Sequence, residues 1–407
     1  MDKYSALKRY FGYETFRRGQ GELIDAVAGG RDALAIMPTG SGKSICFQVP
    51  AVMSDGIALV VSPLISLMKD QVAALKAKGI RAAYINSTLT QTQIETVYRN
   101  MLAGVYKLAY VAPERLQSAK FIEVAQKLKI SLVAVDEAHC ISQWGHDFRP
   151  SYLKINDFIE TLPMRPVIAA FTATATLEVG ADIAQSLKLH DPLCLSTGFD
   201  RPNLRFEVRT PENKLDTLYR IVSGRKKQSG IVYCNTRRTV ERIQTNLYDA
   251  GISVTRYHAG LTDEERRRNQ DDFLEGRRAV IVATNAFGMG IDKRDVRYVI
   301  HYNMPQCLES YYQEAGRAGR DGAKSICLLM YSPDDVHTAK KLIRDTGSNM
   351  DLSKRERRII MRRDFKRLRE MIGYCKAPDC LRGYILDYFG QKHAKNCWNC
   401  SNCSTII

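Results

Sequence analysis

The chain has 407 residues, which is too long for a single hydrophobic core and predicts two to four domains of about 100–200 residues. Apolar residues make up 45% and charged residues 26%, so a disordered or collagen-like chain is excluded, and no apolar run is long enough to span a membrane. Sixty Lys and Arg against 44 Asp and Glu leave a net charge of +16, which favours a polyanionic partner such as nucleic acid.

The first ten residues lack the apolar stretch of a signal peptide, so we expect an intracellular protein, in the cytoplasm or nucleoid if bacterial. Between residues 30 and 190, short β-branched runs alternate with longer amphipathic segments. The runs are apolar on both faces, as in buried parallel strands. We expect strands at residues 57–61, 108–111, 132–135 and 167–170, and helices at 64–78 and 91–102.

The same alternation returns in the second half of the chain. It predicts strands at residues 230–233, 254–257, 279–282, 298–300 and 326–329. Residues 190–205 carry Pro192, Gly198 and Pro202, and we predict that they separate two successive parallel α/β sheets. Each sheet would bind its ligand at the carboxyl ends of its strands. Beyond residue 333, helices are expected at 335–344 and 352–373, the second strongly basic.

A phosphate-binding loop is predicted at residues 37–44, after a strand-like run and before a helix. Glycines are needed there because backbone N–H groups and the helix N-terminus would surround the β-phosphate. Lys43 would reach the β- and γ-phosphates, and the Ser44 hydroxyl would bind Mg²⁺. The first position is Met37 rather than the usual glycine, so a glycine-rich turn without a ligand is the alternative. The loop residues proposed to bind nucleotide are Thr39, Gly40, Ser41, Gly42, Lys43 and Ser44.

Two carboxylates, Asp136 and Glu137, follow the strand expected at 132–135. At such a strand end, Asp136 can hold Mg²⁺ through water while Glu137 polarises the attacking water. An acidic loop without a catalytic role is the alternative. A second such loop in the same sheet as the phosphate loop favours the catalytic interpretation.

Two arginines, Arg317 and Arg320, lie three residues apart and therefore on one face of an expected helix. They would supply positive charge to the γ-phosphate in the transition state. A solvated basic helix is the alternative, although two internal glycines are unusual in one. Because the arginines belong to the second sheet region, hydrolysis would be linked to relative motion of the two domains, as in a motor.

These motifs, in this order and over nearly the whole chain, resemble superfamily-2 helicases and, within them, the RecQ family of DNA helicases. The resemblance implies an α/β protein of two tandem RecA-like parallel-sheet motor domains, at residues 1–197 and 198–333, followed by a small helical zinc-binding subdomain at 334–407. It also implies that Gln20 reads the adenine edge while Tyr13 and Arg17 sandwich the ring, with Gln313 also in the nucleotide site. An amide and a guanidinium are suited to those tasks.

Further segments are similar to the family's DNA-contact and coupling motifs, at residues 62–71, 112–116, 171–176, 233–237, 257–261 and 283–292. The hydroxyls, amides and glycine N–H groups in them are suited to positioning phosphates, but each could instead be a helix cap or a turn. The residues for which the resemblance implies DNA binding are Ser62, Pro63, Arg115, Thr172, Asn235, Arg237, His258 and Thr284.

Residues 140–150, directly after the two carboxylates, resemble the family's aromatic-rich loop, which couples DNA contact to ATP hydrolysis. Trp144 and Phe148 offer surfaces on which bases stack, worth about 1–3 kcal/mol per base, and Arg149 adds positive charge. The alternative is that both aromatic side chains belong to the core. They lie among polar residues without helical or strand spacing, so we expect them to be exposed.

The last 33 residues contain five of the eleven cysteines. Four thiolates, Cys380, Cys397, Cys400 and Cys403, suit tetrahedral Zn²⁺ and match the spacing of the RecQ zinc-binding subdomain. An iron–sulfur cluster is the alternative, because thiolate spacing does not define the metal. Cys375 lies outside the pattern. The six cysteines expected to be small core residues are Cys46, Cys140, Cys194, Cys234, Cys307 and Cys327.

The tail is also basic, since residues 341–407 hold 15 Lys and Arg but 7 Asp and Glu, half of the net charge. We expect it to grip DNA through Arg362, Arg363, Lys366 and Arg367. The sequence stops at Ile407, four residues after Cys403, so we expect no counterpart in it of the winged-helix domain of many RecQ proteins. Either the protein is naturally short or this is a shortened form, and ATP hydrolysis is better supported than efficient unwinding.

The resemblance implies an ATP-dependent 3′→5′ DNA helicase that uses ATP, Mg²⁺ and Zn²⁺, translocates on single-stranded DNA and unwinds tailed or forked duplexes in repair or recombination. Single-strand binding protein and other repair factors are candidate partners, and no membrane is expected. The alternative is a DNA-stimulated ATPase that clamps, anneals or remodels DNA without processive unwinding. An RNA helicase is a third alternative, disfavoured by the aromatic-rich loop and the cysteines.

Overall fold

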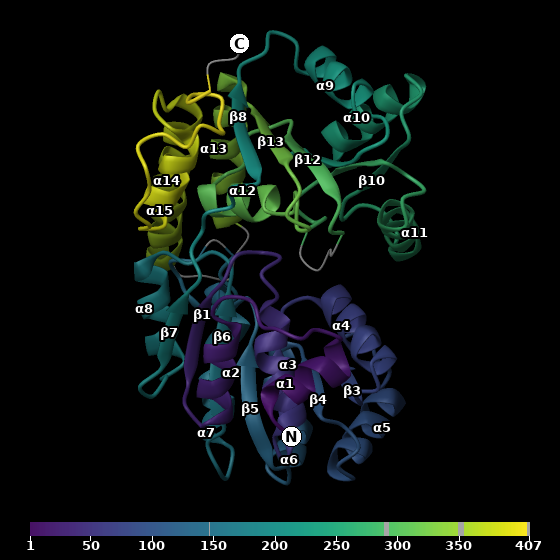
Figure 1. Cartoon of the computed structure of the whole chain (residues 1–407), viewed down its shortest axis with the longest axis vertical. Helices are drawn as coiled ribbons and strands as arrows, with labels where there is room; N and C mark the ends of the chain where they lie inside the picture. The colour runs from purple at the N-terminus through teal and green to yellow at the C-terminus, as the bar shows by residue number, and fades with distance from the viewer. Residues whose placement is uncertain (146, 289–292, 349–353, 405–407) are drawn as a thin grey trace. The chain divides into compact units, whose positions relative to one another are not determined.

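A computed structural model describes residues 1–145, 147–288, 293–348 and 354–404 of the chain (Figure 1). The chain forms two compact units, Met1–Gly198 and Phe199–Ile407, and each is described by itself. Within the described ranges, no helix combines the length and the apolar character needed to cross a membrane.

The first unit is built on a seven-stranded sheet with the order β3-β4-β2-β5-β6-β1-β7, in which every pair of neighbours is parallel. Alternate residues face two different cores. Leu59 and Val61 pack on one face of the sheet, and Ala58 and Val60 on the other, which is why the central runs are apolar throughout. The strands are β1 (Ala33–Ile36), β2 (Ile57–Val61), β3 (Ala82–Ile85), β4 (Leu108–Val111), β5 (Ile130–Val135), β6 (Val167–Thr172) and β7 (Leu193–Ser196).

Helices cover both faces of this sheet (Figure 1). Several begin at a side-chain cap that local sequence supplies, such as Thr90 before α5 and Thr176 before α8. The α-helices are α1 (Lys3–Ala6), α2 (Gln20–Ala28), α3 (Lys43–Met53), α4 (Ile65–Ala77), α5 (Gln91–Leu102), α6 (Ala119–Ala125), α7 (Lys154–Glu160) and α8 (Leu177–Ser186). A π-helical turn (Leu7–Phe11) and short 3₁₀ turns (Pro113–Gln117, Ala138–Ile141, Pro150–Leu153) complete the unit.

The second unit has a six-stranded parallel sheet with the order β10-β11-β9-β12-β13-β8. Its strands are β8 (Leu204–Arg209), β9 (Ser229–Tyr233), β10 (Val254–Tyr257), β11 (Val280–Ala283), β12 (Val296–His301) and β13 (Ser325–Met330). Its helices are α9 (Lys214–Ser223), α10 (Arg237–Asp249), α11 (Asp263–Leu274), α12 (Leu308–Ala315), α13 (Pro333–Ser348), α14 (Lys354–Lys376) and α15 (Leu381–Tyr388). The cysteine segment lies against the edge strand β8, through a bridge between Phe206 and Cys400.

The predicted fold class is confirmed: two parallel α/β sheets precede a small helical region with four clustered cysteines. Three strands escaped prediction, namely β3, β7 and β8. The segment expected to be a break, residues 190–205, contains all of β7 and the start of β8. Both are edge strands with mixed burial, so they lack the continuous apolar run that marked the central strands.

Candidate functional site

The predicted phosphate loop lies between β1 and α3. Gly40 and Gly42 have left-handed backbones, with φ of 81° and 86°, and a Cβ on Gly42 would lie 2.6 Å from the Gln20 amide nitrogen. Lys43 and Ser44 form the first turn of α3, so the loop N–H groups and the helix N-terminus converge. Among the residues that the structure describes, the buried Lys43 Nζ has no hydrogen-bond partner.

The N-terminal segment holds this loop in place. The Arg17 guanidinium donates to the Gly40 carbonyl at 2.7 Å, and the Gln20 amide donates to the carbonyls of Ser41 at 3.2 Å and Gly42 at 3.0 Å. The Gln20 side-chain oxygen accepts from the Arg17 backbone N–H at 2.9 Å, so both ends of that amide are engaged. Tyr13 is exposed. The structure thus brings Arg17 and Gln20 to the phosphate loop, while their roles toward adenine stay a prediction.

The two predicted carboxylates follow β5, and β6 separates that strand from β1. Burial, with repulsion from the Glu137 carboxylate, raises the pKa of Asp136 to about 7, and the Lys43 ammonium opposes this shift. Glu137 has a left-handed backbone with φ of 48°. The Lys43 ammonium therefore interacts electrostatically with the Asp136 carboxyl group, which places the phosphate loop and the acidic motif in one site.

His139 was not among the predicted site residues, although it completes the D-E-A-H order. Its Nδ1 lies 2.9 Å from the Thr172 hydroxyl, at the end of β6, and 3.4 Å from a Glu137 carboxylate oxygen. The imidazole is fully buried. It joins the acidic motif to the segment at 171–176, one of those that resemble the family's DNA-contact and coupling motifs.

The predicted aromatic-rich loop folds directly onto the acidic motif. A Cβ on Gly145 would lie 2.1 Å from the His139 carbonyl oxygen, and the Arg149 N–H donates to the Cys140 carbonyl at 2.9 Å. Trp144 is 46% exposed, as expected, whereas Phe148 is half-buried. His146 of this loop lies outside the described residues.

Neighbouring residues of the predicted DNA motifs are held by internal contacts. The Arg149 guanidinium donates to the Pro63 carbonyl at 3.2 Å and forms an ion pair with Asp147. Arg115 donates to the Asn86 carbonyl at 3.2 Å. The buried Ser62 hydroxyl has no hydrogen-bond partner within the described ranges. The structure thus brings Pro63 and Arg149 together.

In the second unit, the predicted DNA-contact residues follow β9, β10 and β11. Asn235 donates to the Met304 carbonyl at 3.0 Å, and Arg237 is exposed at the start of α10. His258 is buried, with Nε2 2.6 Å from a Glu241 oxygen and Nδ1 accepting from the Gly260 N–H. Thr284 is buried after β11. Residues 289–292 of the motif at 283–292 lie outside the described residues.

Arg317 and Arg320 do not share a helical face, and that prediction is wrong. Helix α12 ends at Ala315, and both arginines lie in the turn that follows it. The physical reason is glycine, because Gly316 caps the helix and Gly319 takes a left-handed backbone with φ of 55°. Arg317 is buried, and a Cβ on Gly288 would lie 2.7 Å from its guanidinium. The buried Gln313 precedes the turn in α12.

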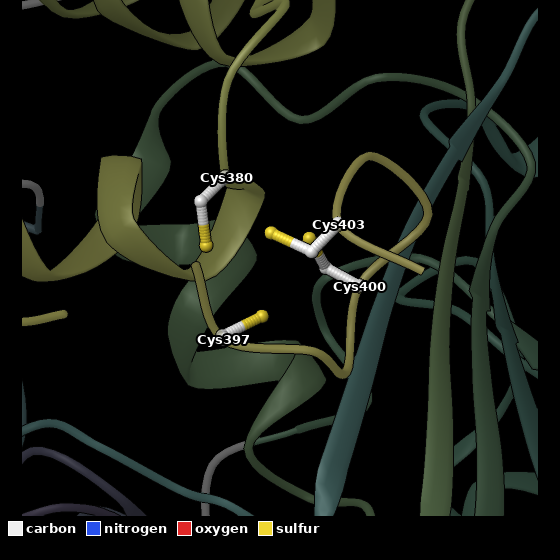
Figure 2. A group of neighbouring side chains, drawn as sticks. All are labelled: Cys380, Cys397, Cys400 and Cys403. Carbon is white, nitrogen blue, oxygen red and sulfur yellow. The ribbon is translucent and has the colours of Figure 1, made fainter. Parts of the chain in front are cut away.

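The four predicted cysteine ligands converge, and their sulfur atoms lie within 4.8 Å of one another (Figure 2). This fits tetrahedral zinc, because Zn–S bonds of about 2.3 Å place the sulfurs about 3.8 Å apart. The Cys380 sulfur accepts from the Gly383 N–H at the start of α15, and the Cys397 sulfur accepts from the Asn399 N–H. Cys375 is buried outside this cluster.

Two expectations about the remaining residues need correction. Of the six cysteines expected in the core, Cys194 is exposed, because β7 is an edge strand. Of the four basic residues expected to grip DNA, Arg362 and Lys366 are exposed. Arg363 and Arg367 instead pack inward as ion-pair partners of Asp364, and Arg367 also pairs with Glu309, because they occupy the packed side of α14.

Residues 17–183 match the DEAD/DEAH box helicase family, residues 213–322 the helicase conserved C-terminal domain, and residues 333–404 the RecQ zinc-binding family. The chain is 49% identical over 401 residues to the ATP-dependent DNA helicase RecQ of Bacillus subtilis, covering 98% of this chain and 66% of the relative. It is 41% identical over 342 residues to the "Probable ATP-dependent DNA helicase RecS" of the same species, covering 83% and 68%.

The DUF1998 helicase MrfA, whose crystal structure contains DNA, shares the fold with a TM-score of 0.69 and 19% identity over 95% of this chain and 54% of that one. The chain spans 61–66% of the length of three bacterial RecQ relatives, less than two thirds of each. The motif order, the four-cysteine cluster and these matches agree, and the chain belongs to the RecQ family of helicases.

Proposed function

We propose that the protein is an ATP-driven DNA helicase that translocates along single-stranded DNA and separates the duplex ahead of it. The observation that carries this proposal is the buried Lys43 ammonium, which is close enough to the acidic motif to oppose the rise in the pKa of Asp136. A buried ammonium without a hydrogen-bond partner in the described residues is costly unless a ligand completes it, and a nucleotide phosphate is suited to that place. Three bacterial relatives carry the name ATP-dependent DNA helicase RecQ, which supports DNA as the substrate.

The chemistry assigned to each residue follows from charge and position. Ser44 and Asp136 would hold Mg²⁺, which when bound supplies positive charge to the phosphates. A divalent cation would also bring the pKa of Asp136 back down. Glu137 would orient and deprotonate the attacking water, while Arg317 and Arg320 would stabilise charge on the γ-phosphate.

We propose that translocation runs 3′→5′, as the family resemblance implies. Duplexes with a 3′ or a 5′ single-stranded tail test the direction, with strand separation followed by fluorescence. Unwinding of the 3′-tailed duplex alone is expected. Preference for the 5′ tail would contradict the direction, and strong DNA-stimulated hydrolysis without strand separation on either duplex would contradict helicase activity itself.

Replacing Trp144 by Ala is expected to preserve basal ATP hydrolysis but to reduce its stimulation by single-stranded DNA about tenfold, since one stacked base is worth about 1–3 kcal/mol. The effect should reach hydrolysis because the loop is fixed to the acidic motif through Gly145. Phosphate release with and without DNA measures it. Leu177→Ala is the matched control, because Leu177 is another exposed apolar residue of this unit. Equal stimulation of the Trp144 variant and wild type would rule out the coupling role.

A further inference from the structure

The segment from Asp200 to Leu204 lies against the turn that carries Arg317 and Arg320. The Arg201 guanidinium donates to three carbonyls of that turn, those of Gly316 at 3.3 Å, Ala318 at 3.0 Å and Gly319 at 2.9 Å. The Asn203 amide adds a second donor to Gly319 at 2.9 Å. Carbonyls at a helix end lack partners within the helix, so these side chains take the place of the next helical turn.

The same segment is also tied to the cysteine cluster. Arg382, two residues after Cys380, donates to the Asp200 carboxylate at 2.6 Å and to the Arg201 carbonyl at 2.7 Å, and it bonds the Leu204 carbonyl as well. The Arg382 side chain is 7% exposed, so these contacts are shielded from competing water.

Asn399 makes a second connection between residues 200–204 and the cysteine cluster. It lies between Cys397 and Cys400, and its amide donates to the carbonyls of Pro202 at 2.9 Å and Leu204 at 3.2 Å. Five consecutive residues, 200–204, are thus bonded to the arginine turn on one side and to the cysteine cluster on the other. All of these contacts lie within the second unit.

We propose that Arg201 and Arg382 are positioning residues that connect the metal site to the arginine turn. Holding the four cysteines on a metal fixes Arg382, which orders residues 200–204, and Arg201 in turn fixes the carbonyls between Arg317 and Arg320. The turn needs this support because Gly316 and Gly319 make its backbone permissive. A planar guanidinium that bonds several carbonyls at once is a rigid connector. The catalytic consequence rests on the proposed function, but the mechanical connection does not.

The test uses the full chain with Arg201→Lys, Arg382→Lys and Asn399→Ala, each of which keeps the overall charge. Lysine cannot reproduce the fork that reaches several carbonyls, and alanine removes the Asn399 amide that donates to Pro202 and Leu204. Amide hydrogen exchange in residues 316–323 should therefore quicken about tenfold in each variant. Removing zinc from wild type with a chelator should have the same effect on the same residues. Arg277→Lys is the control, because Arg277 pairs with Asp272 and Glu275 and touches neither site.

DNA-stimulated ATP hydrolysis supplies the second readout. We expect kcat to fall about tenfold with an unchanged KM for ATP. Misplaced arginines would stabilise the transition state less, whereas nucleotide binding would be unaffected. Arg201→Lys is decisive, since the guanidinium donates to the carbonyls of the turn and is not one of the four clustered metal ligands, so this variant should keep its zinc. Wild-type exchange rates in residues 316–323 of that variant would overturn the connection. A wild-type protein that hydrolyses no ATP would instead refute the proposed function, and the exchange measurement would still decide the inference.

Discussion

Replacing Lys43 by Ala is expected to lower the DNA-stimulated kcat for ATP hydrolysis at least about a hundredfold, since one preorganised charge at the reacting phosphate is worth several kcal/mol. Lys43 is the first residue of α3 and follows the phosphate loop. Its ammonium is buried and has no hydrogen-bond partner among the described residues. A buried ammonium without a hydrogen-bond partner among the described residues costs stability, so the variant should unfold at the same temperature as wild type or higher. Phosphate release and thermal unfolding measure both effects.

Lys76→Ala is the matched control, because Lys76 is an exposed lysine of the same unit, in the last turn of α4. It should hydrolyse ATP at the wild-type rate. The Lys43 variant should still bind a single-stranded oligonucleotide in fluorescence anisotropy, since the proposed DNA contacts do not include Lys43. Turnover above half that of wild type would contradict a phosphate-binding role.

Central strands and the phosphate loop could be predicted because their signals are local. In β2 and β5, successive apolar residues serve two cores, so the run itself marks a strand buried on both faces. Gly42 is dictated by its left-handed backbone and by the Gln20 amide beside it, and Lys43 follows at the helix start. The cysteine cluster was equally predictable from the sequence, because the spacing of the thiolates reflects the geometry of the metal.

The remaining features depend on contacts between distant residues. Spacing suggested that Arg317 and Arg320 share a helical face, but Gly316 ends the helix first. The contacts of Arg201 could not be predicted from the sequence, because its three acceptors lie more than 100 residues away in the chain. Arg367 was counted as DNA-binding surface, whereas its partner Glu309 comes from α12. Residue type showed the charge in each case, and tertiary packing determined its partner.

Replacing Cys400 by Ser is expected to remove zinc and to loosen residues 377–404, with consequences for the edge of the second sheet. Cys400 is fully buried, its backbone bridges Phe206 of β8, and the next residue, Ser401, donates to the Phe206 carbonyl at 3.0 Å. A structural zinc contributes about 10–16 kcal/mol to small domains, so losing even a third of this should lower the unfolding temperature of the second unit by about 10–20 °C.

Metal analysis should find one zinc per wild-type chain and none in the Cys400 variant. Cys375→Ala is the control, because that buried thiol lies in the same tail but outside the cluster, so its removal should leave zinc in place. Iron with visible absorbance in the wild-type protein would overturn the zinc assignment, since four thiolates can also hold an iron–sulfur cluster. Unchanged zinc content after Cys400→Ser would contradict the assignment of Cys400 as a zinc ligand.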